Sequence, residues 1–208
     1  MPAANCTSVE YTNNQISECT ENGISINCGT SKTSIKNNEI NVSGNFGIAI
    51  FGATDSVIAG NTVSRISEYG INLRESFAEV RSSNIIIKNN ASTGGKAGFS
   101  VRNSDGTIVT GNTAIGSSVG SIYVADTCTK TVVKDNSFAN DLLIYDSTAT
   151  IGNNVGEVTK EVKKAADGNW YYYENGVINY YYTGLASNDY GLLRMSRFHL
   201  YRFMQIWK

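Results

Sequence analysis

The most regular feature of the chain is an apolar residue followed three positions later by an asparagine. Successive asparagines are separated by 24, 23, 29, 22, 24 and 18 residues, and each is preceded by Asn, Gly or Asp. These residue types favour turns. A repeat of this length indicates a solenoid, in which each period is one structural unit. The repeated asparagines are Asn14, Asn38, Asn61, Asn90, Asn112, Asn136 and Asn154.

A second motif, a glycine followed by alternating apolar and polar residues, comes eight or nine positions after an asparagine. Alternation with period two predicts strands with one buried face. We expect one inward ladder of Ile24, Ile48, Ile71, Phe99 and Ile122. We expect a second inward ladder of Ile26, Ile50, Leu73, Val101 and Val124.

Each period thus holds short strands and turns, with no room for a helix. One coil cannot bury its own apolar face, whereas coils stacked about 4.8 Å apart build a continuous core. The repeated asparagines are expected to form a third ladder of stacked amides. The sequence therefore predicts an all-β fold, a parallel β-helix of about six to seven coils, over residues 6–156.

A leucine-rich repeat has a similar period and also an asparagine ladder, but it needs leucines and a helical segment in each repeat. Here Ile and Val fill the apolar positions, which favours the β-helix. The asparagine turns and glycine strands resemble the right-handed parallel β-helix repeats of the pectate-lyase-like superfamily. That group includes polysaccharide lyases, glycoside hydrolases and mannuronan C5-epimerases. The resemblance therefore implies the fold and does not single out one activity.

The distribution of charged and apolar residues along the chain bears on which partners the protein can have. The net charge is −1, but residues 192–208 hold four basic residues and no acidic one, which leaves 13 basic and 18 acidic residues elsewhere. An acidic main body gives no electrostatic signature of nucleic-acid binding. No apolar run approaches the roughly 20 residues that span a membrane. We expect neither a nucleic-acid partner nor a membrane span.

The start of the chain has no apolar segment of the kind found in signal peptides. Either the protein is cytoplasmic, or an export signal lies outside this chain. Because the repeat is already running by residue 9, we favour the second alternative and an extracellular or cell-surface location.

The C-terminal part has a different composition. A charged linker is expected over residues 157–168, and eight of the 23 residues over 169–191 are aromatic. Asn175-Gly176 between two apolar runs predicts a β-hairpin. This segment resembles one unit of the aromatic repeats of bacterial cell-wall-binding proteins, which are related to choline-binding repeats. The resemblance implies glycan contacts by Trp170, Tyr171, Tyr172, Tyr173, Tyr181 and Tyr182.

The alternative for these aromatic residues is that they only pack the hairpin. Residues 192–208 match nothing before them and are expected to form an irregular basic tail, the truncated or frame-shifted end of a longer repeat protein.

The outward side of the glycine strands is the best candidate binding surface. Arg74 and Arg102 occupy equivalent positions in adjacent coils, where two guanidinium groups could hold a uronate or a sulfate. The alternative is a solvated face on which they pair with Glu75 or Asp105. The candidate groove residues are Phe51, Tyr69, Asn72, Arg74, Glu75, Arg102 and Tyr123.

Acid–base catalysis has few candidates on this face, and we assign no catalytic residue. Mannuronan epimerases carry a Tyr-Gly-x-Asp-Pro-His stretch, whereas residues 69–74 replace its Asp and its His. Only Glu75, Asp105 and Asp126 could lie near the arginines, and a hard cation needs six or more oxygen ligands. We therefore expect no metal or cofactor, and Ca²⁺ only if the protein is a lyase.

Three functions remain open. The favoured one is a non-catalytic fragment of a longer protein, secreted or surface-attached, that binds polysaccharide or cell-wall glycan. The alternatives are a polysaccharide lyase or related enzyme acting on acidic glycans, and a phage tail-spike or adhesin. The four cysteines leave a further alternative open, because Cys6 and Cys28 lie 22 residues apart, close to one coil. They could form a disulfide or remain buried thiols.

Overall fold

The structure is a computed structural model that describes the backbone of residues 2–41 and 44–156 and of six strands after residue 156. It describes the side chains of residues 4–41 and 44–156 and of Tyr171. The chain divides into two compact units, Met1–Gly156 and Glu157–Lys208. None of the described residues belongs to a helix that is long and apolar enough to cross a membrane.

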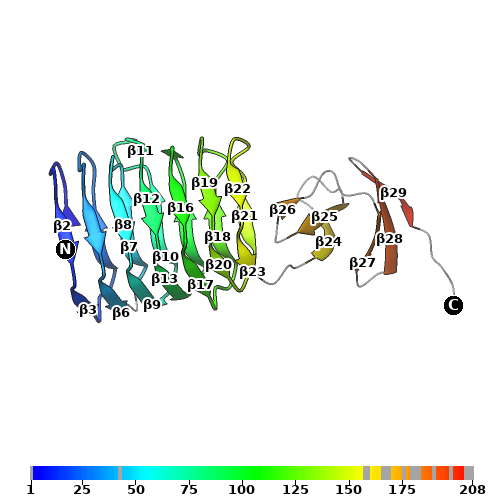
Figure 1. The fold of residues 1–208 in the computed structure, drawn as a ribbon, viewed down its shortest axis with the longest axis horizontal. Coiled ribbons are helices and arrows are strands. Elements are labelled where there is room, and N and C mark those ends of the chain that lie inside the picture. The colour runs from blue at the N-terminus through cyan, green and yellow to red at the C-terminus, as the bar shows by residue number, and fades with distance from the viewer. Residues whose placement is uncertain are drawn as a thin grey trace. The chain divides into compact units, whose positions relative to one another are not determined.

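The first unit is a solenoid of three parallel sheets with seven strands each (Figure 1). Sheet A contains β1 (Pro2–Ala3), β4 (Asn22–Ile26), β7 (Phe46–Phe51), β10 (Tyr69–Arg74), β14 (Ala97–Val101), β18 (Gly120–Val124) and β21 (Leu142–Ile144). Sheet B contains β2 (Glu10–Thr12), β5 (Ser34–Lys36), β8 (Val57–Ala59), β12 (Ile86–Lys88), β16 (Ile108–Thr110), β19 (Val132–Lys134) and β22 (Thr150–Gly152). Sheet C contains β3 (Gln15–Ser17), β6 (Glu39–Asn41), β9 (Thr62–Ile66), β13 (Ala91–Gly94), β17 (Thr113–Ile115), β20 (Ser137–Phe138) and β23 (Val155–Gly156).

The chain visits sheets B, C and A in turn and then starts the next coil, so the predicted all-β solenoid of about six to seven coils is confirmed. A further two-stranded sheet pairs β11 (Ser82–Ser83) with β15 (Ser104–Asp105).

Both predicted apolar ladders lie in the core. Ile71 pairs with Ile48 and Phe99, and Leu73 pairs with Ile50 and Val101. Ile71 and its neighbours in the ladder are almost wholly buried. Burial of each large aliphatic side chain contributes roughly 1.5–3 kcal/mol, so the stacked rows are the main source of stability for each coil.

The asparagine ladder is also confirmed. Each of the first six side-chain amides donates a hydrogen bond to Oδ1 of the next asparagine at 2.8–3.0 Å. The residue before each of the seven asparagines has a φ between 54° and 66°, in the left-handed region. Asn, Asp and Gly tolerate this conformation best, which explains why only they occur there.

The glycines that open the sheet A strands stand where sheets A and C meet. A Cβ on Gly70 would overlap the side chain of Ser92, and one on Gly98 would lie 2.7 Å from the Cβ of Ala114. Ser92 and Ala114 belong to sheet C. The glycines are therefore needed because the two sheets approach too closely for a side chain.

A second row of turns, between sheets A and B, was not predicted. Ser8, Lys32, Asp55, Asn84, Gly106 and Lys130 follow one another there with φ between 50° and 65°. Ser and Thr hydroxyls support these turns, as where Ser56 Oγ accepts the backbone N–H of Thr33 at 3.0 Å. This role accounts for the many Ser and Thr residues.

The second unit contains two three-stranded antiparallel sheets. One consists of β24 (Lys160–Lys164), β25 (Trp170–Glu174) and β26 (Val177–Ile178). The other consists of β27 (Gly184–Asn188), β28 (Gly191–Ser196) and β29 (His199–Phe203).

These strands differ from the sequence prediction in two places. The expected linker over 157–168 contains β24, which pairs with the aromatic strand β25. The expected irregular tail over 192–208 contains most of β28 and all of β29, which pair with each other. Apolar and polar residues alternate through much of this tail, a pattern that favours strands. The pairing of β25 with β26 matches the predicted hairpin, although Asn175 and Gly176 themselves lie outside the described residues.

The cysteines are not joined. Cys6, Cys19 and Cys28 are half-buried, Cys128 is buried, and all four are free thiols. Of the two alternatives for Cys6 and Cys28, the structure therefore has the unbonded one.

Candidate functional site

The outward face of sheet A carries the predicted groove residues. Arg74 is in register with Phe51, and Asn72 is in register with Ala49 and Ser100. The backbone N–H of Arg102 donates to the carbonyl of Leu73, which places Arg102 one coil beyond Arg74 at the equivalent position. The prediction that the two arginines are neighbours in adjacent coils is therefore met in the described structure.

Arg74 lies against two phenylalanines. Its guanidinium carbon is 4.7 Å from the ring centre of Phe51 and 5.5 Å from that of Phe77. Both distances are within the range of a cation–π interaction. Phe51 is buried, with 6% of its surface exposed, so one of the two rings is fixed by packing.

Arg102 lies against two tyrosines. Its guanidinium carbon is 5.1 Å from the ring centre of Tyr69 and 4.9 Å from that of Tyr123. Its Nη2 also donates a hydrogen bond to the hydroxyl of Tyr69 at 2.6 Å. Tyr69 stacks in turn on Phe46, with ring centres 5.8 Å apart. The arginines and rings thus form one layer across the sheet, which we call the arginine cluster: Phe51, Tyr69, Arg74, Phe77, Arg102 and Tyr123.

Burial within the cluster raises the pKa of the Tyr123 hydroxyl, although the nearby positive charge of Arg102 acts in the opposite direction. Tyr123 is therefore a neutral hydrogen-bonding group at physiological pH.

Neither arginine of the cluster forms an ion pair with a described residue. Asp105, one of the two expected partners, binds Arg81 instead, with Nη2 and Nε donating at 2.7 and 2.9 Å. Glu75, the other, accepts a hydrogen bond from Asn103. The expected pairing of these arginines with Glu75 or Asp105 is therefore not found among the described residues.

Asn72 is buried instead of in contact with solvent, with 1% of its surface exposed. Ser100 in the next coil is fully buried. Among the described residues, Asn72 Oδ1, Ser100 Oγ and the Nε atoms of Arg74 and Arg102 have no hydrogen-bond partner. Buried polar atoms are nearly always satisfied, so these four have hydrogen-bonding capacity left for water or for a bound group.

An insertion shapes one edge of the groove. The 29-residue step between Asn61 and Asn90 is longer than the other steps because residues 75–81 leave the coil as a loop. The loop holds Phe77 with 91% of its surface exposed, 6.4 Å from the ring of Phe51. The sequence analysis missed Phe77, although the irregular step was a signal of the insertion.

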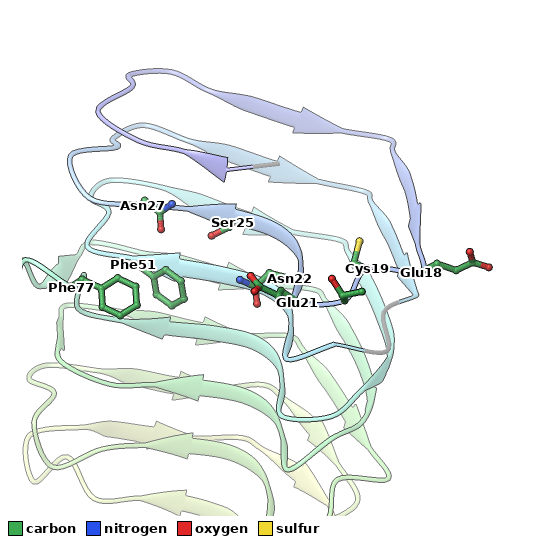
Figure 2. Close-up of a pocket in the computed structure, with 9 residues that line it drawn as sticks. Glu18, Cys19, Glu21, Asn22, Ser25, Asn27, Phe51 and Phe77 are labelled. Carbon is green, nitrogen blue, oxygen red and sulfur yellow. The ribbon is translucent and has the colours of Figure 1, made fainter.

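A hollow of about 590 Å³ lies beside the cluster (Figure 2). Figure 2 shows Phe51 and Phe77 on one side of the hollow and Cys19 and Glu21 on the other. It was not predicted, because it depends on how loops from different coils meet. Its lining residues are Glu18, Cys19, Thr20, Glu21, Asn22, Ser25, Asn27, Phe51 and Phe77.

In the described part of the chain, the His, Cys, Asp and Glu side chains form no group of three or more that could hold a metal ion. The hydroxyl of Tyr69 accepts a hydrogen bond from Arg102, and the ring of Tyr123 also lies against that guanidinium group. Two guanidinium groups among aromatic rings can hold an anion.

The candidate wall-binding aromatics are only partly described. Trp170, Tyr171, Tyr172 and Tyr173 lie on β25, and Tyr171 is half-buried. Tyr181 and Tyr182 lie outside the described residues. Their role as ligand contacts remains a prediction.

Comparison with solved structures gives a match to an alginate lyase from Paenibacillus sp. str. FPU-7, with 19% identity and a TM-score of 0.56. The match covers 68% of this chain and 56% of that protein, and it shows a shared fold. A search of curated proteins gives no match. The sequence profile described as "Right handed beta helix region" matches residues 3–138. This profile covers well over half of the chain, so the protein belongs to the right-handed β-helix family.

Proposed function

We propose that this protein binds an acidic polysaccharide along the outward face of sheet A. The observation that carries the proposal is the arginine cluster. Its two guanidinium groups stand in adjacent coils among aromatic rings and form no ion pair with any residue whose side chain the structure describes. Guanidinium forks match carboxylates in geometry and charge. Aromatic rings offer a flat apolar surface to the C–H face of a sugar.

The regular spacing of the coils supports a polymeric ligand. Adjacent coils lie about 4.8 Å apart, close to the length of one sugar unit, so a chain along the solenoid axis meets a new coil with each unit. The neighbour with the same fold is named an alginate lyase, and alginate is an acidic polysaccharide. At 19% identity this similarity is consistent with the proposal without establishing it.

The test is binding of the purified protein to polygalacturonate and alginate, measured by affinity electrophoresis and calorimetry. We expect Arg74→Ala and Arg102→Ala each to weaken binding by roughly 10- to 100-fold, because each removes a charge-assisted contact. Lys134→Ala removes the same charge from an exposed position on sheet B and should leave binding unchanged. Equal binding by all three variants, or no binding by the wild type, would remove the proposal.

A second candidate function is a polysaccharide lyase. The hydrogen bond of Arg102 to the Tyr69 hydroxyl favours it, because it places a proton acceptor beside a cationic group that can neutralise a uronate. In β-elimination a base takes the proton next to the carboxylate, the bond to the leaving sugar oxygen breaks, and a double bond forms between the two sugar carbons. The leaving oxygen takes up a proton from an acid or from water and departs as a hydroxyl group. Shortened glycan chains with an unsaturated uronate end, formed in the presence of Ca²⁺ and lost in Tyr69→Phe and Arg74→Ala, would establish this activity.

We also propose that the protein acts at the bacterial cell surface, where the second unit holds it on wall glycan. The aromatic strand β25, with Trp170 and three tyrosines, supports this idea through its likeness to wall-binding repeats. The test is co-sedimentation of the whole chain with purified cell walls. A Trp170→Ala variant that sediments as well as the wild type would count against the proposal.

A further inference from the structure

The hollow beside the arginine cluster has a different chemistry from the cluster itself. None of the described residues that line it is basic, and their polar groups are amides, hydroxyls, a thiol and carboxylates. Figure 2 shows Glu21 at its edge, while the side chain of Glu18 extends away from it. Ser25 and Asn27 lie along and just beyond β4.

The hollow adjoins the arginine cluster along the candidate groove, because the two share lining residues. Phe51 and Phe77 line the hollow and also contact the guanidinium of Arg74. Strand β4, which carries Ser25, pairs with β7, and β7 pairs with β10, which carries Arg74. A polymer that lies over Arg74 and continues along the axis therefore passes over the hollow within one or two coils.

The loop that presents Phe77 is fixed at both ends. The Ser76 hydroxyl accepts the N–H groups of Ala78 and Val80, each at 3.2 Å, which closes the turn. Arg81 binds Asp105 in the next coil and donates to the carbonyl of Thr127 at 2.8 Å. The backbone that carries this large, exposed aromatic side chain is thus tethered at both ends of the loop. Such preorganisation lowers the entropic cost of binding a partner.

The charges decide which sugar fits there. A second uronate over the hollow would be repelled by the Glu21 carboxylate, and none of the described lining residues is basic and could offset its charge. An uncharged sugar can instead donate hydroxyl groups to Glu21 and to the amide oxygen of Asn27. Its C–H face can stack on Phe77, as sugar rings do on exposed aromatic side chains.

We infer that the hollow is a subsite for an uncharged sugar unit, so that the ligand is an acidic heteropolysaccharide in which a uronate adjoins an uncharged sugar. This inference rests on the proposed function, because it assumes that the arginine cluster holds the uronate. It assigns Phe77 and Glu21 a role in specificity.

The test compares two kinds of polymer on the whole chain. Chondroitin and hyaluronan alternate glucuronate with an uncharged N-acetylhexosamine, whereas polygalacturonate contains uronate alone. We expect the better alternating polymer to bind about tenfold more tightly than polygalacturonate, the equivalent of one good aromatic contact. Phe77→Ala should abolish that advantage by weakening binding of the alternating polymer about tenfold more than binding of polygalacturonate. Glu21→Gln should strengthen polygalacturonate binding.

Val80→Ala, in the same loop and also exposed, is the matched control and should change neither affinity. Unaltered melting temperatures show that the variants are folded. If both polymer types bind equally and Phe77→Ala and Glu21→Gln have no effect, the inference is overturned while the proposed function stands. If no acidic polymer binds, the proposed function fails, and the inference fails with it.

Discussion

At the scale of single residues, the asparagine ladder shows how one side chain links three coils. Asn61 donates to Asn90 Oδ1 at 2.9 Å and to the carbonyl of Ile35 at 3.0 Å. Its own Oδ1 accepts from both the backbone and the side chain of Asn38. Four hydrogen-bonding groups in neighbouring coils thus depend on this one fully buried amide.

Asn61→Ala should therefore destabilise the protein by about 1–3 kcal/mol, because it leaves buried polar groups without partners. Chemical denaturation followed by circular dichroism measures the change. Asn41→Ala, at an exposed position on β6, is the matched control and should be nearly neutral. An unchanged unfolding midpoint in Asn61→Ala would show that the ladder contributes nothing to stability.

The residues of the candidate site differ in how far sequence could predict them. Arg74 and Arg102 could be paired because the repeat fixes which positions are equivalent in successive coils. Asn72 was placed on the correct face, but its almost complete burial depends on how neighbouring side chains pack, which no repeat encodes. Phe77 was missed because it lies in an insertion that departs from the period.

At the scale of elements, the strands of sheet A owe their register to their inward side chains. Ile71 is fully buried between Ile48 and Phe99. A charge at this position would meet only apolar neighbours, and an isolated charge in such surroundings is very costly.

Ile71→Asp should therefore prevent the coils from stacking, which would appear as aggregated protein or as loss of the cooperative unfolding transition. Ile115→Asp introduces the same charge at a position on β17 that is 46% exposed and should leave the protein folded. A soluble Ile71→Asp variant with a cooperative transition would contradict the inward register.

The loop over residues 75–81 depends on the ion pair of Arg81 with Asp105. The Arg81 hydrogen bond lowers the pKa of Asp105 from 3.8 to about 2. Because the folded pKa is depressed, this stabilisation is present above pH 3.8 and is lost as the pH falls through about 2. The pair is two-fifths exposed, so its contribution is about 1 kcal/mol or less.

We expect Arg81→Leu to melt slightly below the wild type at neutral pH. The difference should shrink towards zero as the pH falls from 3.8 to about 2. Thermal melts at several pH values measure it. A difference that stays constant with pH would mean that Arg81 acts through packing and its contact with Thr127 rather than through charge.

At the scale of the whole molecule, the predicted features are those set by repetition. Stacking explains the three sheets, the buried rows and the shared face of the arginines, because each follows from placing equivalent positions above one another. The 29-residue step signals an insertion, but no repeat encodes the conformation of the loop of Phe77 or the hollow beside it. Strands β24 and β28 were missed because they occur once and have no repeat to reveal them.

The pitch of the solenoid leads to a prediction on ligand length. The candidate groove extends over the five adjacent strands β4, β7, β10, β14 and β18. Four strand spacings give it a length of roughly 19 Å. Affinity for oligosaccharides of the preferred glycan should rise with each added unit up to about five units and then level off. Calorimetry on a series of defined length measures this, and an affinity already maximal for a disaccharide would contradict a groove along the axis.

The way the insertion leaves its coil has a consequence for protein engineering. Residues 75–81 depart at a turn, and the strands before and after them keep the register of the preceding coil, as the pairs of Arg74 with Phe51 and of Ile86 with Val57 show. Segments of other lengths and compositions can therefore be exchanged at this point while the scaffold keeps its shape. If Phe77 sets ligand selectivity as inferred, exchange of this loop should change the selectivity of such a protein while the coils keep their fold.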